Sequence, residues 1–268
     1  MLLGQGGDEL FWGYGFLSEG AALTSRHISC KKKGWRSAFE YLTPDGKLEL
    51  GAIRRGWEEF AKDRREPFNY IHMMEVTPDF QSMQANRNNI FSESFLAAVP
   101  PENAFKPLAV PAGSQLSGDQ MVVRAICKTY LRENGMAQAD RLAMSSGVEV
   151  RLPLCDYRLA ELSLGLKGAN SDRHLEPKYW LRQVMQSILP DEIFRRPKQG
   201  FAPPVHRWIG KIFKVYGHWL RGGHLVAADI LNEKTADRWS RGDFEWDGVF
   251  PAPLKALSLE AWCRMLNE

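Results

Sequence analysis

Cysteine is scarce in this sequence, and it occurs in none of the patterns that mark a metal site or a disulfide framework. The four residues, Cys30, Cys127, Cys155 and Cys263, stand far apart and form no C-x-x-C or histidine-paired spacing. Isolated thiols of this kind are typical of a protein in a reducing compartment, so we expect a cytoplasmic location.

Long apolar runs and clustered charge are also lacking. No segment approaches the roughly 20 apolar residues that cross a bilayer, and no basic region precedes an apolar one at the N-terminus, so we expect neither a membrane partner nor a signal peptide. The net charge is only +3, and the basic residues are scattered apart from a run between Cys30 and Arg36. We interpret that run as a solvated loop and expect no nucleic-acid partner.

Helical periodicity dominates what is present. The pattern predicts helices at 8–17, 52–62, 118–133, 137–145, 157–165, 177–188, 204–220 and 253–266. Extended structure is expected only at 1–3 and 148–152. Nine tryptophans and fourteen phenylalanines are many for 268 residues, which favours a large interface as well as a core. The sequence therefore predicts a mainly α-helical body, with an irregular insertion of short helices and loops at 18–117.

The first candidate site is the string GQGGDE, Gly4 to Glu9. Glycines allow successive backbone N–H groups to turn toward a bound anion, and a helix that begins behind them adds a favourable dipole. Asp8 and Glu9 are the carboxylates that Mg²⁺ would use beside phosphates. A tight turn with an acidic helix cap is the alternative interpretation.

The second candidate site lies between Ala139 and Leu162. Asp140 and Arg141 open it, Glu149 and Arg151 alternate on one side of a short extended segment, and Asp156 is placed to cap the next helix. The alternative is a buried ion pair with a purely structural role at a helix junction.

The third candidate site lies between Arg195 and Ile209. Pro197, Pro203 and Pro204 stiffen a loop that carries Lys198. A lysine on a rigid loop can place its charge on a phosphate or on a developing oxyanion. The alternative is an ordinary surface lysine between prolines.

In this order, the three sites resemble the synthetase domain of the glutamine-hydrolysing asparagine synthetases and of related β-lactam-forming and peptide-cyclising ligases. The family patterns G-x-G-x-D-E-L-F-x-G-Y, D-R-x-x-M-x-x-x-x-E-x-R-x-P-x-x-D and R-P-K-x-G-F match residues 4–14, 140–156 and 196–201. The resemblance implies the C-terminal helical part of an α/β ATP-pyrophosphatase-type domain, similar to the adenine nucleotide α-hydrolases, with a remnant of a parallel sheet. It also implies one partial synthetase domain over 1–268.

The resemblance implies a chemistry and assigns roles to residues. Such ligases adenylate a carboxylate with MgATP and let an amine attack the acyl-adenylate, as in asparagine biosynthesis, so ATP and Mg²⁺ are the expected cofactors. Lys198 would stabilise charge on the adenylate and on the transition state. Gln5 would be the second catalytic residue, in the loop beside the pyrophosphate. The remaining positions divide between the pyrophosphate and Mg²⁺ site, at Gly4, Gly6, Gly7, Asp8 and Glu9, and the substrate wall, at Asp140, Arg141, Glu149, Arg151 and Asp156.

This sequence departs from the family pattern in two ways. Gln5 stands where asparagine-forming members often have glutamate, and a neutral amide can orient a substrate but cannot accept a proton. No S-G-G-x-D-S triphosphate loop occurs, and Leu2 follows Met1 where the glutaminase nucleophile would be a cysteine. We therefore expect a fragment, a mispredicted start or one subunit of a split enzyme, with weak or no ATP binding alone.

An incomplete domain should also expose apolar side chains near residues 1–3 and on the first helix. Its expected partners are a small carboxylate, an amine, and an upstream segment or a second copy of the chain. Two other functions remain open. One alternative is a non-catalytic scaffold or interaction module derived from this family. The other is a simple phosphate binder that uses the first site alone.

Overall fold

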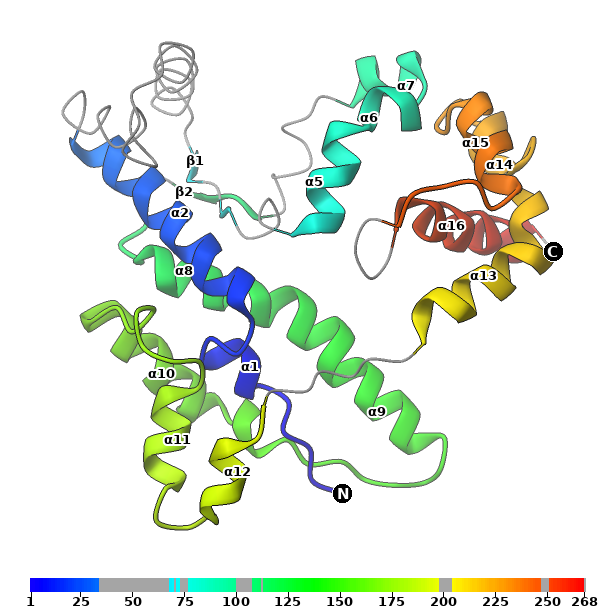
Figure 1. The fold of residues 1–268 in the computed structure, drawn as a ribbon. Helices are drawn as coiled ribbons and strands as arrows, with labels where there is room; N and C mark the ends of the chain where they lie inside the picture. Colours follow the sequence, from blue (N-terminus) through cyan, green and yellow to red (C-terminus); the bar gives the residue numbers. More distant parts are fainter. Residues whose placement is uncertain are drawn as a thin grey trace. The chain divides into compact units, whose positions relative to one another are not determined.

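In a computed structural model of the protein, the structure describes residues 1–33, 68–69, 71–72, 77–99, 108–111, 113–197, 204–246 and 251–267. These residues are mostly helical, as the sequence predicts (Figure 1). They divide into two compact units, one formed by Met1–Met74 with Phe105–Arg195 and the other by Glu75–Ala104 with Arg196–Glu268. The expectation of one domain with an insertion at 18–117 stays a prediction.

Unit 1 holds the first two candidate sites. Its described elements are α1 (Gly7–Leu10), α2 (Gly15–Lys33), β1 (Phe68–Asn69), β2 (Val110–Pro111), α8 (Gly118–Ile126), the π-helix η4 (Cys127–Met136), α9 (Ala137–Met144), the 3₁₀-helix η5 (Pro153–Cys155), α10 (Tyr157–Ala169), α11 (Tyr179–Met185) and α12 (Asp191–Arg195). The two short strands pair antiparallel, with Phe68 opposite Pro111.

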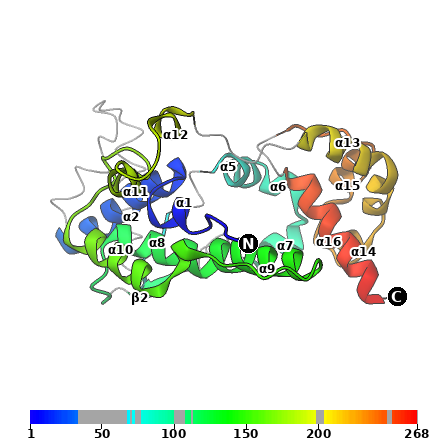
Figure 2. The same ribbon diagram turned by 90° about the horizontal axis from the view of Figure 1, so that it is seen from below.

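The core of unit 1 lies where α1 and α2 meet α8. Leu10, Leu17, Met121 and Val122 are almost fully buried there. Gly118 lets α2 and α8 approach closely, because a Cβ at this position would lie 2.2 Å from the Ser25 Oγ. Both views place α1 beside α8 and α10 (Figures 1 and 2). The glycine-rich segment is therefore set directly on the core of this unit.

The prediction of a single helix at 8–17 is wrong. The structure ends α1 at Leu10, places Trp12 at a φ of +56°, and begins α2 at Gly15. The indole of Trp12 donates a hydrogen bond to the buried Asp172, so a tertiary contact outweighs local helix propensity here. α2 then runs to Lys33, well beyond the expected end.

The two helices expected at 118–133 and 137–145 form one uninterrupted helical run. α8 passes into the π-helix η4 and then into α9. The expected interval between the two helices contains Gly135, which is buried and whose missing Cβ makes room for the side chains of Leu131 and Gln5. The other expected helices correspond to α10, α11, α13 and α16, and 52–62 lies outside the described residues.

The two extended segments expected at 1–3 and 148–152 lie side by side. Leu2 and Arg151 form a parallel bridge, in which the Arg151 N–H donates to the Met1 carbonyl at 2.8 Å and the Leu3 N–H donates to the Arg151 carbonyl at 3.1 Å. This isolated bridge pairs two segments almost 150 residues apart, and the parallel sheet that the resemblance implied stays a prediction.

Unit 2 is built from short helices around a separate core. Its described elements are α5 (Pro78–Ala85), α6 (Arg87–Ile90), α7 (Glu93–Ala98), α13 (Val205–Tyr216), the 3₁₀-helix η6 (Gly217–Leu220), α14 (His224–Ala227), α15 (Glu233–Ser240) and α16 (Ala252–Asn267). Its core gathers Ile209, Phe213, Trp239 and Leu257. An antiparallel bridge between Phe91 and Leu231 joins the residues near 90 to the C-terminal helices.

The expected apolar exposure is found at the N-terminus but not on the first helix. Met1 and Leu2 are 64% and 72% exposed, whereas Leu10 and Leu17 are buried in the core. That part of the prediction is wrong because α1 and the start of α2 pack against α8. In the described residues of α10, α11 and the segment after them, exposed apolar side chains occur at Leu162, Leu166, Trp180, Val184 and Ile188.

Candidate functional site

The glycine loop before α1 packs against the second candidate site. Gly6 has a φ of +96°, and a Cβ there would lie 2.8 Å from the Leu154 carbonyl oxygen and 3.0 Å from the Cys155 Sγ. The Cys155 thiol donates to the Gln5 carbonyl at 3.3 Å. Only glycine fits this combination of positive φ and close approach. The structure thus brings together two predicted sites that are about 150 residues apart.

Glu9 is the buried carboxylate of the loop. Its side chain is 1% exposed, and one carboxylate oxygen, Oε2, accepts a hydrogen bond from the Gly6 N–H at 3.1 Å. The other oxygen, Oε1, has no hydrogen-bond partner among the described residues. Burial, together with the charge of Glu9, raises the pKa of the Cys127 thiol to about 11 and also raises the pKa of Tyr14.

Asp8 is the accessible carboxylate of the loop. Its Oδ1 lies 2.9 Å from the Nζ of Lys178, and both side chains are about one-third exposed. The backbone of Lys178 has a φ of +61°, and its N–H donates to the Phe11 carbonyl at 2.7 Å. Sequence reasoning missed Lys178. The available signal was a cation at the start of an expected helix, where the helix dipole disfavours it unless an anion is near.

Gln5 lies against the π-helix. Its side-chain oxygen would lie 3.3 Å from a Cβ on Gly135, and its backbone carbonyl accepts a hydrogen bond from the Cys155 thiol. Gly4 is exposed, and a Cβ there would meet no atom within 4 Å, whereas one on Gly7 would lie 3.1 Å from the Leu154 side chain. Close packing thus restricts Gly6 and Gly7 but not Gly4.

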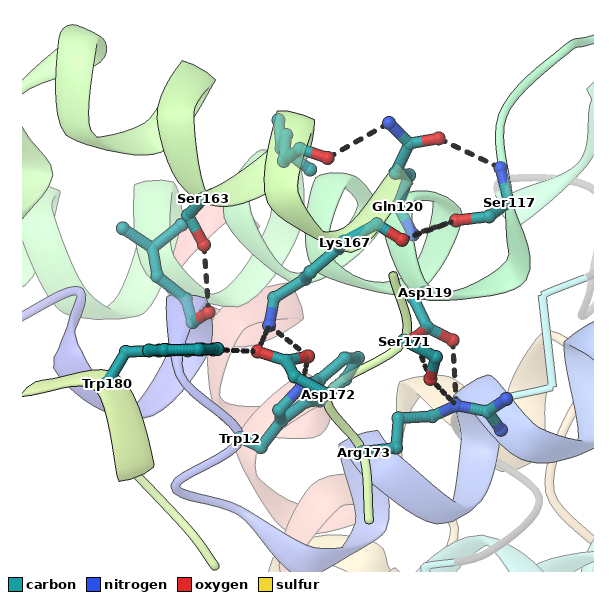
Figure 3. Close-up of polar contacts among 12 residues, drawn as sticks. Trp12, Ser117, Asp119, Gln120, Ser163, Lys167, Ser171, Asp172, Arg173 and Trp180 are labelled. Atoms are coloured by element: carbon teal, nitrogen blue, oxygen red, sulfur yellow. Dashed lines mark hydrogen bonds and ion pairs between the residues drawn. The ribbon is translucent and has the colours of Figure 1, made fainter. Parts of the chain in front are cut away.

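A buried polar cluster joins Lys167 of α10 and Asp172 to two tryptophans, Trp12 and Trp180 (Figure 3). The Nζ of Lys167 lies 2.9 and 3.0 Å from the two carboxylate oxygens of Asp172. The indole N–H of Trp12 donates to Oδ1 of Asp172 and that of Trp180 donates to Oδ2, at 2.5 and 3.0 Å. Burial lowers the pKa of Lys167. Burial alone would raise the pKa of Asp172, but the donors from Trp12 and Lys167 outweigh it and the pKa is lowered.

A second buried carboxylate holds the neighbouring residues to α8. Asp119 is 2% exposed, lies 2.8 Å from the Arg173 guanidinium and accepts from the Ser171 hydroxyl at 2.7 Å. The side chains of Ser171 and Arg173 therefore bind Asp119, whereas the side chain of Asp172 points toward Trp12 and Trp180, as Figure 3 shows. Sequence reasoning identified neither cluster, because single acidic residues in a helical pattern give no sign of their partners.

Within the second site, the expected geometry is partly observed. Glu149 and Arg151 form an ion pair at 2.5 Å, but both side chains are about 70% exposed, so the alternative of a buried pair is wrong. Asp156 caps α10 by accepting from the Arg158 N–H, as expected. Hydrogen bonds from the Arg158 side chain and backbone lower the pKa of Asp156 to about 2.

The remaining predicted residues are not brought to the loop by any observed contact. Asp140 and Arg141 are exposed on α9 and make no ion pair within the described part of the chain. Lys198 lies outside the described residues, so its place relative to Asp8 stays a prediction.

No metal site or membrane helix is evident in the described ranges. Among those residues, no three histidine, cysteine, aspartate or glutamate side chains gather closely enough to hold a metal ion. No helix there is both long and apolar enough to cross a bilayer. Unit 2 contains a cavity of about 650 Å³, bordered by Asn88, Asn89, Lys234, Arg238 and Trp239, which includes none of the predicted site residues.

Comparison with known proteins adds independent information. The family described as asparagine synthase matches residues 1–264. A putative glutamine-hydrolysing asparagine synthetase of Mycobacterium bovis is 25% identical over 84% of this chain and 31% of its own length. Asparagine synthetase 1 of Bacillus subtilis is 22% identical over 91% of this chain and 35% of its own length. The asparagine synthetase of Gallus gallus is 28% identical over 43% of this chain and 20% of its own length.

The chain spans about one third of the length of the first two of these relatives. No solved structure gives a significant match. The family match covers nearly all residues, including the loop at Gly4–Glu9 and the packed segment at 151–156. This chain therefore belongs to the asparagine synthase family.

Proposed function

We propose that this chain is the amide-forming part of an asparagine-synthetase-like ligase. In the proposed reaction, a carboxylate oxygen attacks the α-phosphorus of ATP and displaces pyrophosphate. An amine nitrogen then attacks the acyl carbon, the bond to AMP breaks, and the nitrogen loses a proton. The observation that carries the proposal is the packing of the Gly6 loop against Leu154 and Cys155, because it joins two of the family's motifs at one place.

The loop fits a magnesium pyrophosphate group. Asp8 is accessible, and the buried Glu9 has an oxygen without a partner among the described residues, so these two carboxylates are the proposed ligands. Mg²⁺ takes one or two protein carboxylates and completes its octahedron with water and phosphate oxygens, so a larger group of ligands is not required. When bound, the ion would neutralise charge on the departing pyrophosphate.

The other residues then receive roles that follow from their charge and position. Lys178, paired with Asp8, and Lys198 would supply cations to the phosphates and to the developing negative charge. Gln5 would orient the substrate by hydrogen bonds. The substrate wall would comprise Asp140, Arg141, Glu149, Arg151 and Asp156.

The parallel pairing of Leu2 with Arg151 supports the fold that the resemblance implied. In α/β folds with a parallel sheet, ligands bind at the carboxyl ends of the strands. Here the chain passes from Leu3 directly into the glycine loop, so the loop follows the carboxyl end of the first paired segment. We infer an ATP-pyrophosphatase-type sheet on this basis.

Titration calorimetry with pyrophosphate in excess Mg²⁺ tests the proposal. We expect one molecule bound per chain, and we expect Gly6→Ala to weaken binding at least about tenfold, because its Cβ would be forced against the Leu154 carbonyl. Gly222→Ala is the matched control, since Gly222 also has a positive φ of 60° but no atom within 4 Å of its Cβ position. An intact chain that gives no heat with pyrophosphate contradicts the proposal.

A non-catalytic scaffold is the second candidate, and one observation favours it. Gln5, which cannot accept a proton, replaces the glutamate common in asparagine-forming members and lies packed against the π-helix. Lys198→Ala separates the two functions in the same titration. A ligase should lose most of its pyrophosphate affinity, whereas a scaffold should show no change.

A further inference from the structure

Asp172 connects the two segments that carry Asp8 and Lys178. Trp12 follows the short helix that begins with the glycine loop, and Trp180 lies two residues after Lys178. Each indole donates to a different oxygen of the same carboxylate (Figure 3). The Lys178 N–H also donates to the Phe11 carbonyl, and the Lys178 ammonium pairs with Asp8. The two segments are therefore joined through Asp172, through this backbone hydrogen bond and through the ion pair.

The carboxylate is fully committed to these contacts. Its two oxygens accept from two indoles and from the ammonium of Lys167, which also lies 4.3 Å from the centre of the Trp12 ring. The side chains of Lys167 and Asp172 are 1% and 9% exposed. A buried ion pair is weak evidence for stability, because desolvation offsets most of its attraction. Its clearest consequence here is geometric, since it fixes the orientation of both indoles.

We propose that Asp172 is a positioning residue for the anion site at the glycine loop, acting through Trp12 and Trp180 on the spacing of Asp8 and Lys178. This inference rests on the proposed function. Asp172 touches neither the loop nor its ligand. It holds the two segments from which the opposite charges at the loop project, in the way that outer contacts orient the ligands of a metal site.

The neighbouring Asp119 provides a matched control. It is also buried, also ion-paired, and it holds the same short segment through Ser171 and Arg173. No contact given by the structure joins Asp119 to Trp12 or Trp180. Asn at either position keeps the side-chain shape but removes the charge and turns one acceptor into a donor. Each substitution removes one buried, ion-paired charge and should lower stability to a similar degree, but only Asp172→Asn alters the acceptor of the two indole N–H groups.

The experiment compares Asp172→Asn with Asp119→Asn in the full chain. Pyrophosphate affinity in excess Mg²⁺ and the midpoint of urea unfolding are measured for both variants. We expect similar losses of stability, but an affinity loss of about tenfold or more only for Asp172→Asn, within the range found for outer-shell partners. Equal affinity losses would assign a merely structural role to Asp172 and overturn the inference.

Trp180→Phe decides the question if Asp172→Asn does not fold. Trp180 is 42% exposed, so loss of its N–H should leave the fold intact while freeing the start of α11. We expect weaker pyrophosphate binding, and a smaller effect of Lys178→Met in this background than in the unchanged chain. Unchanged binding overturns the inference but leaves the proposed function standing. Absence of binding in the unchanged chain overturns both, so the two failures are distinguishable.

Discussion

The ammonium of Lys178 lies 2.9 Å from Oδ1 of Asp8, although 170 positions separate the two residues in the sequence. The pair is partly exposed, so it contributes at most about 1 kcal/mol to stability. Lys178 nevertheless has a left-handed backbone, which costs a non-glycine residue about 1–2 kcal/mol. The ion pair alone does not offset this strain, and the strained backbone supports the ligand-binding role that we propose for Lys178.

Replacement of Lys178 separates these two effects. Lys178→Gly removes the cation and also the backbone strain, whereas Lys178→Met removes only the cation. We expect the glycine variant to be more stable than the methionine variant by about 1 kcal/mol. Both should bind pyrophosphate equally poorly in calorimetry. Retention of full affinity by either variant would exclude Lys178 from the anion site.

Asp156 gives a pH dependence whose sign follows from its hydrogen bonds. Its pKa falls from an ordinary 3.8 to about 2 in the folded chain. The stabilising effect of the carboxylate on α10 is therefore present above about pH 4 and is lost as the pH falls toward 2. We expect the difference in thermal midpoint between the intact chain and Asp156→Asn to shrink over that interval. A difference that is constant between pH 5 and pH 2 would contradict this cap geometry.

Two glycines in helices should respond to alanine in opposite directions. Gly118→Ala should destabilise unit 1, because the new Cβ would meet the backbone and side chain of Ser25 at less than 3 Å. Gly165→Ala, in α10, has open space around the Cβ and should stabilise by about 0.5–1 kcal/mol through helix propensity. Urea unfolding measures both, and a stabilising Gly118→Ala would show that α2 and α8 do not pack as described.

Glu260 is the buried carboxylate of unit 2. It is fully buried, and its two oxygens accept from the N–H groups of His224 and Leu225 at 2.9 and 3.0 Å. Glu260→Gln should destabilise by about 1–3 kcal/mol, because the new amide group faces a donor and leaves it unpaired. The exposed Glu245→Gln serves as a control in the same thermal unfolding experiment. Equal midpoints for the two variants would be incompatible with this contact.

Local patterns in the sequence were sufficient for part of the fold. Helical periodicity located α8, α10, α13 and α16, and the short extended segments at 1–3 and 148–152 were recognised and do pair. The break at Phe11 and Trp12 could not be predicted, because its cause is a hydrogen bond to Asp172, 160 residues away. The continuity of the helical run from α8 through η4 at Gly135 has the same kind of cause, because it depends on close packing that helix propensity does not describe.

The candidate site was predictable to a similar degree. Glycine spacing and the acidic pair identified the loop, and Asp156 was recognised as a helix cap. Lys178 and Asp172 were missed because their importance depends on partners that only the folded chain brings near. The burial of Glu9 was equally hidden, since adjacent carboxylates look alike in a sequence while one faces the core and the other is accessible.

A crystal structure of the chain grown with magnesium pyrophosphate tests the central claim most directly. The account predicts the anion beside the glycine loop, Mg²⁺ on Asp8 and Glu9, and the ammonium groups of Lys178 and Lys198 on the same phosphates. Lys198 on the far side of the molecule from Asp8, or pyrophosphate bound away from the glycine loop, would contradict it.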